Sequence, residues 1–377
     1  MRWAALVAVG LAAVALSGCF DGTVREAPQA RGKHGGGSQG HQGGDKKGGG
    51  EGEQGGGGAS GDGISFAAVG DTDMGDTPIL PPEPASYLDP VKGELKGDVV
   101  FGNLEGTLTD VSEDVKCGGA APGTCFAFRA PPHYAKYLAQ AGFTVMNLAN
   151  NHSFDFGEAG QEETIEALRG AGIEPTGLPA EATIVRAGGK TIAFLGFAPY
   201  DYTNSLTDLE GARALIARAR EAADLVVVAI HAGAEGSDAT HVTGEEEIYL
   251  GEDRGNAEEF AHMAVRAGAD LVLGSGPHVL RGMEIYRGRL IAYSLGNFSG
   301  YENFSIEGVL GETVVLHATL APDGSFRSGR LASVRMIEDG RPVPDPEGAG
   351  AALVAQLSKE DFGSHGIDLD SEGRFSR

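Results

Sequence analysis

The sequence is poor in cysteine, in tryptophan and in positive charge. It has 3 Cys and 1 Trp, and its 29 Lys and Arg face 53 Asp and Glu, a formal net charge of −24. This balance excludes nucleic acid as a partner, because phosphate binding needs a basic surface. The N-terminal apolar run, residues 3–15, is shorter than the roughly 20 residues of a membrane-spanning helix. No strand end carries Gly-x-Ser-x-Gly and no Walker-type loop is present, which disfavours a Ser-nucleophile hydrolase and a nucleotide-driven motor.

The N-terminus has the three parts of a secretory signal. Arg2 supplies a positive charge, residues 3–15 form the apolar run, and small residues precede Cys19. A basic head, an apolar stretch of about a dozen residues and a small-residue cleavage site are typical of a segment removed on export. A short membrane anchor or a buried helix is the alternative. We therefore predict export, with residues 1–18 as the signal peptide.

The cleavage site, Leu16-Ser17-Gly18-Cys19, resembles the lipobox of bacterial lipoproteins. The resemblance implies that Cys19 becomes the new N-terminus and carries acyl chains. Several chains hold firmly to a membrane, because each buried CH₂ contributes about 0.8 kcal/mol. The expected location is thus extracytoplasmic, lipid-anchored to the cell membrane.

Residues 19–63 are expected to form a disordered linker behind this lipidated cysteine. More than half of residues 32–63 are Gly, and no apolar periodicity is present. Without apolar surface to bury, the entropy of ordering is not offset. A Gly-rich coil of this length reaches on the order of 35 Å, so the folded part would stand off the membrane.

Two cysteines remain, Cys117 and Cys125, in a Gly/Pro-rich stretch. In an oxidising compartment such a pair predicts a local disulfide, which stabilises by about 2–3 kcal/mol in the chain-entropy model. The alternative is a pair of metal-binding thiols. The absence of a second Cys pair disfavours it.

After residue 64 the chain alternates β-rich and helical segments. The predicted strands are residues 64–69, 98–101, 143–148, 182–185, 191–197, 224–230, 269–273, 283–286, 290–295, 309–320 and 326–336. The predicted helices are residues 131–141, 158–171, 208–222, 256–267 and 348–357. This α/β order, without repeats or a second linker, predicts one folded domain over residues 64–345. A C-terminal helix and a polar, frayed tail are expected over residues 346–377.

Polar side chains follow the C-terminal ends of five of the apolar strands. They are Asp71, Asn103 with Glu105, Asn151 with His152, His231 with Glu235, and His278. Each alone has a structural explanation, such as a turn cap, a left-handed turn, a surface position or a satisfied histidine. Because the carboxyl ends of strands in an α/β sheet converge on one crevice, the full set predicts a shared site.

The donor types in this set indicate the chemistry of the site. Carboxylate, amide and imidazole groups suit divalent metal ions such as Mn, Fe, Zn or Mg, and soft thiolate ligands are absent from the set. Two such ions about 3.5–4 Å apart would clamp the attacking and leaving oxygens of a displacement at phosphorus.

The same residues lie in a series of short motifs. In chain order these are Gly70-Asp71, Asn103-Leu104-Glu105-Gly106, Asn147-Leu148-Ala149-Asn150-Asn151-His152 with Asp155 and Gly157, His231-x-Gly233-x-Glu235, Gly276-Pro277-His278-Val279, Glu284-x-Tyr286-x-Gly288 and Tyr293-Ser294-Leu295-Gly296-Asn297-Phe298. From about residue 64 to about residue 320 the chain resembles the CapA family, the poly-γ-glutamate capsule synthesis proteins. That family is similar to the calcineurin-like metallophosphoesterases. The resemblance implies a four-layer α/β/β/α sandwich and a dinuclear metal site at the strand ends.

The resemblance also implies a role for each matched residue. The implied metal ligands are Asp71, Asn103, Glu105, Asn151, His231 and His278. The implied catalytic residues are His152, Asp155 and Glu235. His152 would be the acid or charge stabiliser beside the leaving oxygen, and Glu235 would orient His231.

One segment departs from the family pattern. Many members read Gly-His-His-Pro-His-Val where this chain has Ser275 and Gly276 in place of two histidines. The number of metal ions and the catalytic power are therefore open. Asp73, two residues after Asp71, would either supply a compensating oxygen or lie at the surface.

Two functions are compatible with this sequence. The first is a metal-dependent phosphoester hydrolase or transferase acting in capsule, poly-γ-glutamate or other envelope polymer biosynthesis outside the cell. The second is a non-catalytic accessory lipoprotein that binds the polymer or a membrane polymer synthase. Polymer binding that persists in the presence of chelator would distinguish the second from the first.

Overall fold

The computed structural model describes residues 24–26, 63–118, 120–121 and 124–377. The predicted signal peptide, Cys19 and most of the predicted linker lie outside the described residues. Within the described part of the chain, no helix has the length and apolar character needed to span a bilayer.

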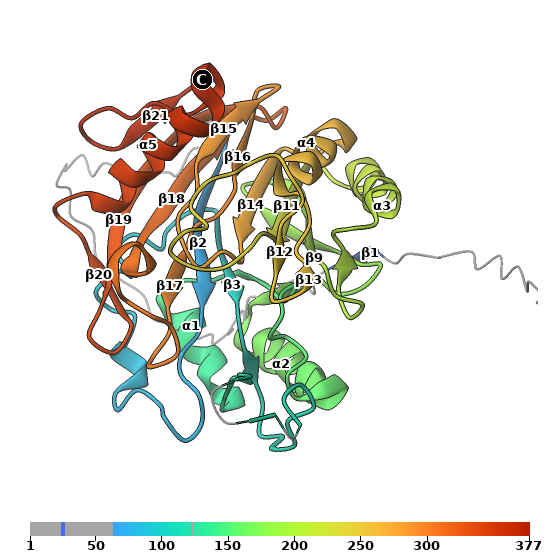
Figure 1. The fold of residues 1–377 in the computed structure, drawn as a ribbon. Coiled ribbons are helices and arrows are strands. Elements are labelled where there is room, and N and C mark those ends of the chain that lie inside the picture. Colours follow the sequence, from blue (N-terminus) through green and yellow to red (C-terminus); the bar gives the residue numbers. More distant parts are fainter. Residues whose placement is uncertain (1–23, 27–62, 119, 122–123) are drawn as a thin grey trace, which may run out of the picture.

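Two β-sheets lie face to face in the molecule, and each is named here after a central strand (Figure 1). The β11 sheet has the order β1-β8-β9-β11-β14-β16-β15, with β10 beside β9. Its strands are β1 (Val24–Glu26), β8 (Ala182–Ala187), β9 (Lys190–Ala198), β10 (Asn204–Ser205), β11 (Leu225–His231), β14 (Leu271–Ser275), β15 (Met283–Tyr286) and β16 (Arg289–Ala292).

The β2 sheet has the order β20-β19-β18-β2-β3-β6-β7, with β17 beside β2 and β21 beside β19. Its strands are β2 (Ile64–Thr72), β3 (Val99–Leu104), β6 (Val145–Asn147), β7 (Glu174–Thr176), β17 (Asn297–Ser299), β18 (Glu312–Leu320), β19 (Phe326–Ile337), β20 (Arg341–Pro344) and β21 (Arg374–Ser376).

The central strands run parallel and are buried along their length. β11 pairs in parallel with β9 and β14, and β2 pairs in parallel with β3. The sequence of β11, Leu-Val-Val-Val-Ala-Ile-His, is almost continuously apolar and β-branched, as expected for a strand covered on both faces. Parallel strands bring their carboxyl ends to one edge, where the predicted polar residues lie.

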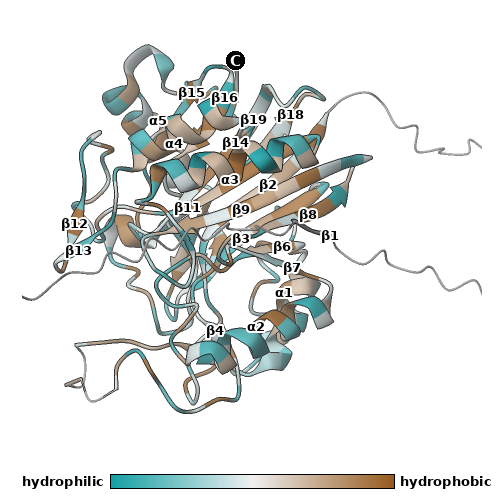
Figure 2. Ribbon diagram, turned by 90° about the vertical axis from the view of Figure 1, so that its right-hand side faces the viewer, coloured by the Kyte–Doolittle hydropathy of each residue, from teal (hydrophilic) through white to brown (hydrophobic). Residues whose placement is uncertain are grey.

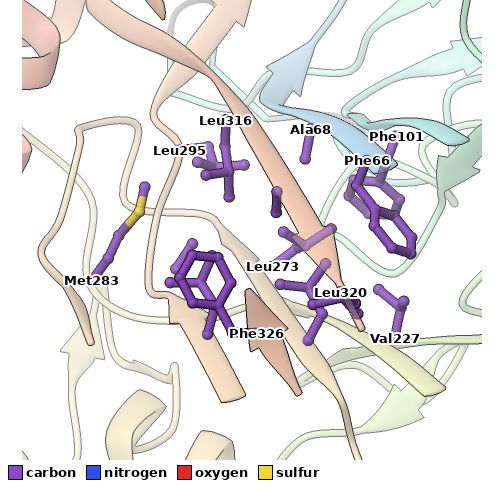
Figure 3. Close-up of a cluster of buried hydrophobic side chains, with 14 of the residues drawn as sticks. Phe66, Ala68, Phe101, Val227, Leu273, Met283, Leu295, Leu316, Leu320 and Phe326 are labelled. Atoms are coloured by element: carbon purple, nitrogen blue, oxygen red, sulfur yellow. The ribbon is translucent and has the colours of Figure 1, made fainter. Parts of the chain in front are cut away.

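One hydrophobic core fills the space between the sheets (Figure 3). The β2 sheet contributes Phe66 and Phe101, and the β11 sheet contributes Val227 and Leu273, each at most 2% exposed. The ring of Phe101 stacks at 6.3 Å on Phe194 of the opposite sheet. This packing joins the two sheets into one body.

Helices cover the outer face of each sheet. On the β11 sheet lie α3 (Leu209–Ala222) and α4 (Ala257–Ala267), and on the β2 sheet lie α1 (Ala135–Ala141) and α2 (Gly157–Ala171). The side chains of Asp208 and Asn256 cap α3 and α4 by accepting from Gly211 N and Glu259 N. The strands are mainly brown and the helices mixed in hydropathy (Figure 2), as expected for one-sided burial. The four-layer α/β/β/α prediction is confirmed.

The C-terminal segment packs against the β2 sheet. Helix α5 (Ala349–Phe362) runs five residues beyond its predicted end and buries Val354 in the central core. The prediction of a frayed tail is wrong, because β21 pairs with β19 and Phe375 stacks on Phe326 at 5.3 Å. In the sequence, Phe375 within the polar C-terminal stretch was the indication that this segment is packed.

Short elements complete the fold and were not predicted separately. They are η1 (Pro84–Ser86), β4 (Thr107–Leu108), β5 (Arg129–Ala130), η2 (Pro132–Tyr134), β12 (Ile248–Tyr249), β13 (Glu252–Asp253), η3 (Gly308–Gly311) and η4 (Gly363–His365). The predicted disulfide is confirmed, since Cys117 and Cys125 are bonded.

Candidate metal centre

The site lies where β2, β3, β11 and β14 end. Asp71 of β2 is in register with Asn103 of β3, and His231 of β11 is in register with Ser275 of β14. Glu105 follows β3 directly. Parallel pairing aligns the residues within each sheet, and the face-to-face packing of the two sheets brings the two pairs together.

Three of the predicted ligands form a compact group. Asp71, Glu105 and His231 each place one ligand atom within 4.8 Å of the others, and all three side chains are fully buried. His278 adjoins them, with Nδ1 3.3 Å from Asp71 Oδ2 and Nε2 3.6 Å from Glu105 Oε1. Because a metal held at about 2.0–2.2 Å keeps its ligand atoms within about 4.4 Å of one another, a small contraction would close the group on an ion.

Several atoms that could bind a metal are buried and have no hydrogen-bond partner. In the group these are Asp71 Oδ2, both carboxylate oxygens of Glu105 and His231 Nε2, and Asn151 Oδ1 is a further one. A buried polar atom without a partner is costly, and a buried carboxylate more so. One divalent cation would satisfy several of these atoms together. The donor set is also the one that Mn, Fe, Zn or Mg prefers.

The electrostatics of the group follow from its burial and its crowded charges. Burial lowers the pKa of His231 to about 3, so its imidazole is neutral, the form that binds metals. Burial and the neighbouring charge of Asp71 raise the pKa of Glu105 well above its usual range. Burial alone would lower the pKa of His278, but the charges of Glu105 and Asp71 raise it to about 10. Two acidic groups in one buried space favour a bound cation.

Ser275 orients His231 from the side opposite the cluster. Its hydroxyl contacts the Ile230 carbonyl at 3.4 Å and His231 Nδ1 at 3.1 Å. A serine that donates to the carbonyl accepts from Nδ1–H, and this tautomer leaves the lone pair on Nε2. Ser275, at a position where the resemblance implies a histidine, thus orients the candidate ligand His231.

Gly276 cannot be replaced by histidine without rearrangement. Its φ is +114°, and a Cβ built on it would lie 2.9 Å from the Ala232 backbone nitrogen. Gly276 lies in the tight turn between β14 and His278, and His278 itself has a φ of 60°. This local backbone therefore requires glycine.

Asn103 was predicted as a metal ligand, but in this geometry it positions the candidate ligand Asp71. Its Nδ2 donates to Asp71 Oδ1 at 2.8 Å, while its Oδ1 accepts from Asn147 at 2.8 Å and from Asn150 at 3.2 Å. The amide oxygen is thereby committed to its neighbours. Asn151, by contrast, keeps a buried Oδ1 without a partner and remains a candidate ligand.

Asp73 lies neither in the cluster nor at the surface. It is 3% exposed, and its carboxylate accepts from Met74 N at 2.6 Å, Gly75 N at 3.2 Å and the side chain of Asn303. Both oxygens are used. Asp73 therefore fixes the loop that carries Asn303 and does not replace a missing histidine.

The second group of predicted residues forms a hydrogen-bonded pair beside the cluster. His152 Nδ1 lies 2.8 Å from Asp155 Oδ2, and Phe128 N donates to the same oxygen at 2.7 Å. Lys116, which was not predicted, places Nζ 3.1 Å from Asp155 Oδ1. It also donates to the Asn151 carbonyl at 2.8 Å. These contacts hold the His152 ring in one orientation, stacked at 4.4 Å on Phe128.

Glu235 occupies a different place from the predicted one. Its carboxylate pairs with Arg254 at 3.0 Å and lies 3.7 Å from His278 Nε2. His231 instead contacts the Ser275 hydroxyl through Nδ1. The prediction that Glu235 orients His231 is corrected accordingly, because the turn at Gly233 carries the chain away from that ring.

A cavity of about 620 Å³ borders the site. Asn151, His152 and His278 line it together with Lys116 and Arg254, while Asp71, Glu105 and His231 lie buried behind this lining. A cavity of this size holds a drug-sized ligand. A larger cavity of about 790 Å³ shares none of its lining residues with this one.

A sequence model of the bacterial capsule synthesis protein PGA_cap family matches residues 65–301. The chain belongs to this family. The matched range includes every predicted ligand from Asp71 to His278 and both members of the His152–Asp155 pair.

Curated relatives carry related names. The capsule biosynthesis protein CapA of Bacillus anthracis is 33% identical over 183 residues, 43% of this chain and 41% of that protein. The PGA biosynthesis protein CapA of Bacillus subtilis is 32% identical over 180 residues, 43% and 44%. A probable polyglutamine synthesis accessory protein of Mycobacterium tuberculosis is 29% identical over 265 residues, 64% and 65%. The matched part thus spans less than half of the first two relatives and under two thirds of the third.

A solved 5′-nucleotidase precursor from Thermus thermophilus aligns with 78% of this chain and 58% of its own. The TM-score is 0.39 and the identity is 15%.

Proposed function

We propose that this protein acts in the synthesis or processing of an envelope polymer of the capsule type, through metal-dependent cleavage or transfer of a phosphoester. The names of the relatives support the first part. The observation that carries the second is the set of buried donor atoms without partners on Asp71, Glu105, Asn151 and His231.

The residues present fit a divalent metal, and their roles follow from their positions. Asp71, Glu105 and His231 would hold it, with His278 beside them and Asn151, which lines the same cavity as His278, as a further candidate. A bound metal supplies Lewis acidity and lowers the pKa of a bound water. Ser275 and Asn103 keep the ligands oriented through their hydrogen bonds.

His152 supplies the proton that the reaction needs. As the water oxygen bonds to phosphorus, the bond from phosphorus to the ester oxygen breaks, and its electron pair leaves with that oxygen. His152 would give the departing oxygen a proton, while Asp155, itself paired with Lys116, holds the ring in place. The attacking water releases one proton, which restores His152, so the products are an alcohol and hydrogen phosphate, and atoms and charge balance.

The location is part of the same proposal. Residues 1–18 would be removed as a signal peptide, and a lipid on Cys19 would hold residues 64–345 near the membrane through the linker. Growth with a radiolabelled fatty acid tests the lipid directly. The label should enter the wild-type chain and be absent from Cys19→Ala.

A non-catalytic function is the second candidate, because the mycobacterial relative is named an accessory protein. The chain would then bind a nascent polymer or a membrane synthase. With a formal charge of −24, it would repel polyglutamate unless a bound metal bridges the two.

A phosphatase assay on the purified full chain separates the two candidates. We expect release of phosphate from small esters with added Mn²⁺, its loss with chelator, and its loss in Asp71→Ala and His231→Ala. His317→Gln is the matched control, because His317 also pairs with a carboxylate, Glu94 at 2.8 Å, but lines the other cavity. Binding of polymer by a chelator-treated chain that hydrolyses no ester would favour the accessory function.

A further inference from the structure

Exposed apolar side chains gather at the mouth of the metal cleft. Among the described residues, five large hydrophobic side chains are exposed: Leu250 at 87%, Phe126 and Ile248 at 58%, Ile79 at 57% and Val115 at 54%. Four of the five lie in two segments: Val115 and Phe126 flank the Cys117–Cys125 disulfide, and Ile248 and Leu250 belong to the β12–β13 hairpin. Phe126 and Leu250 line the cleft itself. Such clustering distinguishes a binding surface from scattered apolar residues.

An aromatic path leads from this mouth to the site. Phe126 stacks on Phe128 at 6.3 Å, and Phe128 stacks on His152 at 4.4 Å. Phe128 also meets Phe304 edge to face at 6.5 Å, and Phe304 lies 5.3 Å from the ring of His278. One branch of the path therefore reaches His278, and the other reaches His152, which in the proposed reaction protonates the leaving oxygen.

The opposite wall is built differently and offers little free ring surface. Tyr202 lies between Phe154 at 5.0 Å and Tyr200 at 5.4 Å, with nearly parallel planes. Arg254 covers Tyr200 at 5.9 Å and Tyr249 at 5.3 Å. Both faces of Tyr200 and Tyr202 are thus already in contact. Stacking of a planar ligand ring on this wall is disfavoured, and the open apolar surface lies on the Phe126 side.

We propose that the substrate is a phosphoester whose leaving group carries an apolar chain, and that Phe126 and Leu250 receive this chain at the cleft mouth. The inference rests on the proposed phosphoester cleavage and adds the class of the leaving group. Insertion of the hairpin into a bilayer is the competing explanation. Its exposed residues Glu252 and Asp253 disfavour that, because anionic membrane surfaces repel acidic segments.

A chain-length series tests the inference on the full chain. The substrates are n-alkyl phosphates from ethyl to octyl, kept below their micelle concentrations, with Mn²⁺. For the wild type kcat/KM should rise about two- to fourfold per added methylene over the first carbons, as expected for burial of CH₂ groups. In Phe126→Ser/Leu250→Ser the slope should fall to half or less. Ile79→Ser, equally exposed but outside the cleft, should keep the wild-type slope.

The outcomes separate this inference from the proposed function. Hydrolysis without chain-length dependence, or an unchanged slope in the double variant, overturns the inference alone. Absence of hydrolysis of every ester overturns the proposed function. Calorimetric binding of octyl against ethyl phosphate to the Mn²⁺-loaded chain then still tests the apolar mouth, and equal affinities would overturn it. Loss of binding to phosphatidylcholine vesicles in the double variant, with no change in slope, would assign the residues to the membrane.

Discussion

Arg281 offers the sharpest test of how the loop over the site is held. This arginine is fully buried, and its guanidinium makes two 2.7 Å bonds to the Glu247 carboxylate and a third to the Ala239 carbonyl. Glu247 also accepts from Ala234 N at 2.9 Å. These bonds tie the segment from residue 233 to 255, which carries Glu235 and Arg254, to the chain after His278.

The expected cost of Arg281→Met follows from what it leaves behind. Removal of one partner of a buried ion pair costs about 3–5 kcal/mol, because the other charge stays buried. The Glu247 side chain is 14% exposed, so water reaches it and the lower end, about 3 kcal/mol, is expected. In Arg281→Met/Glu247→Leu no charge is stranded, and about 2 kcal/mol should be recovered.

Urea unfolding of the two variants measures this difference through the midpoint and the slope. The single variant should also lose ester hydrolysis while still folded, since Arg254 and Glu235 would no longer be fixed beside His278. A cost below about 1 kcal/mol for Arg281→Met, or a double variant less stable than the single one, would refute the reasoning.

Three further predictions concern the site and its loop. Cys117→Ser/Cys125→Ser should lower the free energy of unfolding by about 2–3 kcal/mol in urea titrations, and dithiothreitol should then have no added effect. Mn²⁺ affinity measured by calorimetry should fall as the pH is lowered, because the raised pKa of Glu105 lets protons compete with the metal; Glu105→Gln should flatten this dependence. Asp155→Asn should lower kcat about 10²–10⁴-fold with unchanged metal content, since a neutral amide replaces the charged carboxylate beside the His152 ring; an equal loss of metal would contradict that role.

Local patterns predicted the α/β order of elements and a shared site at the strand ends, whereas the four-layer sandwich was implied by the family resemblance. Apolar runs mark the strands, and a polar residue directly after a run marks a strand end. The predicted first strand stopped at Val69, whereas β2 continues to Thr72. The reason is tertiary: Asp71 pairs with Asn103 and Asn297 on the two neighbouring strands, which no local propensity reveals.

The residues that sequence reasoning missed act through long-range contacts. Lys116 lies in a loop without periodicity, and only its position next to Cys117 hinted at an anchored side chain. In the sequence, Ser275 indicated only that a histidine ligand was missing. Its contact with His231 could not be predicted, because the two residues lie 44 positions apart in the chain. The pair of Arg281 and Glu247 is likewise visible only once the fold is closed.

The central claim is that the buried donors at the strand ends hold a divalent metal. Elemental analysis of the purified full chain after incubation with Mn²⁺ and desalting tests it most directly. At least one bound metal per chain is predicted for the wild type and for His317→Gln, with loss in Asp71→Ala and in His231→Ala. A wild-type chain without metal, or variants that retain it in full, would contradict the account.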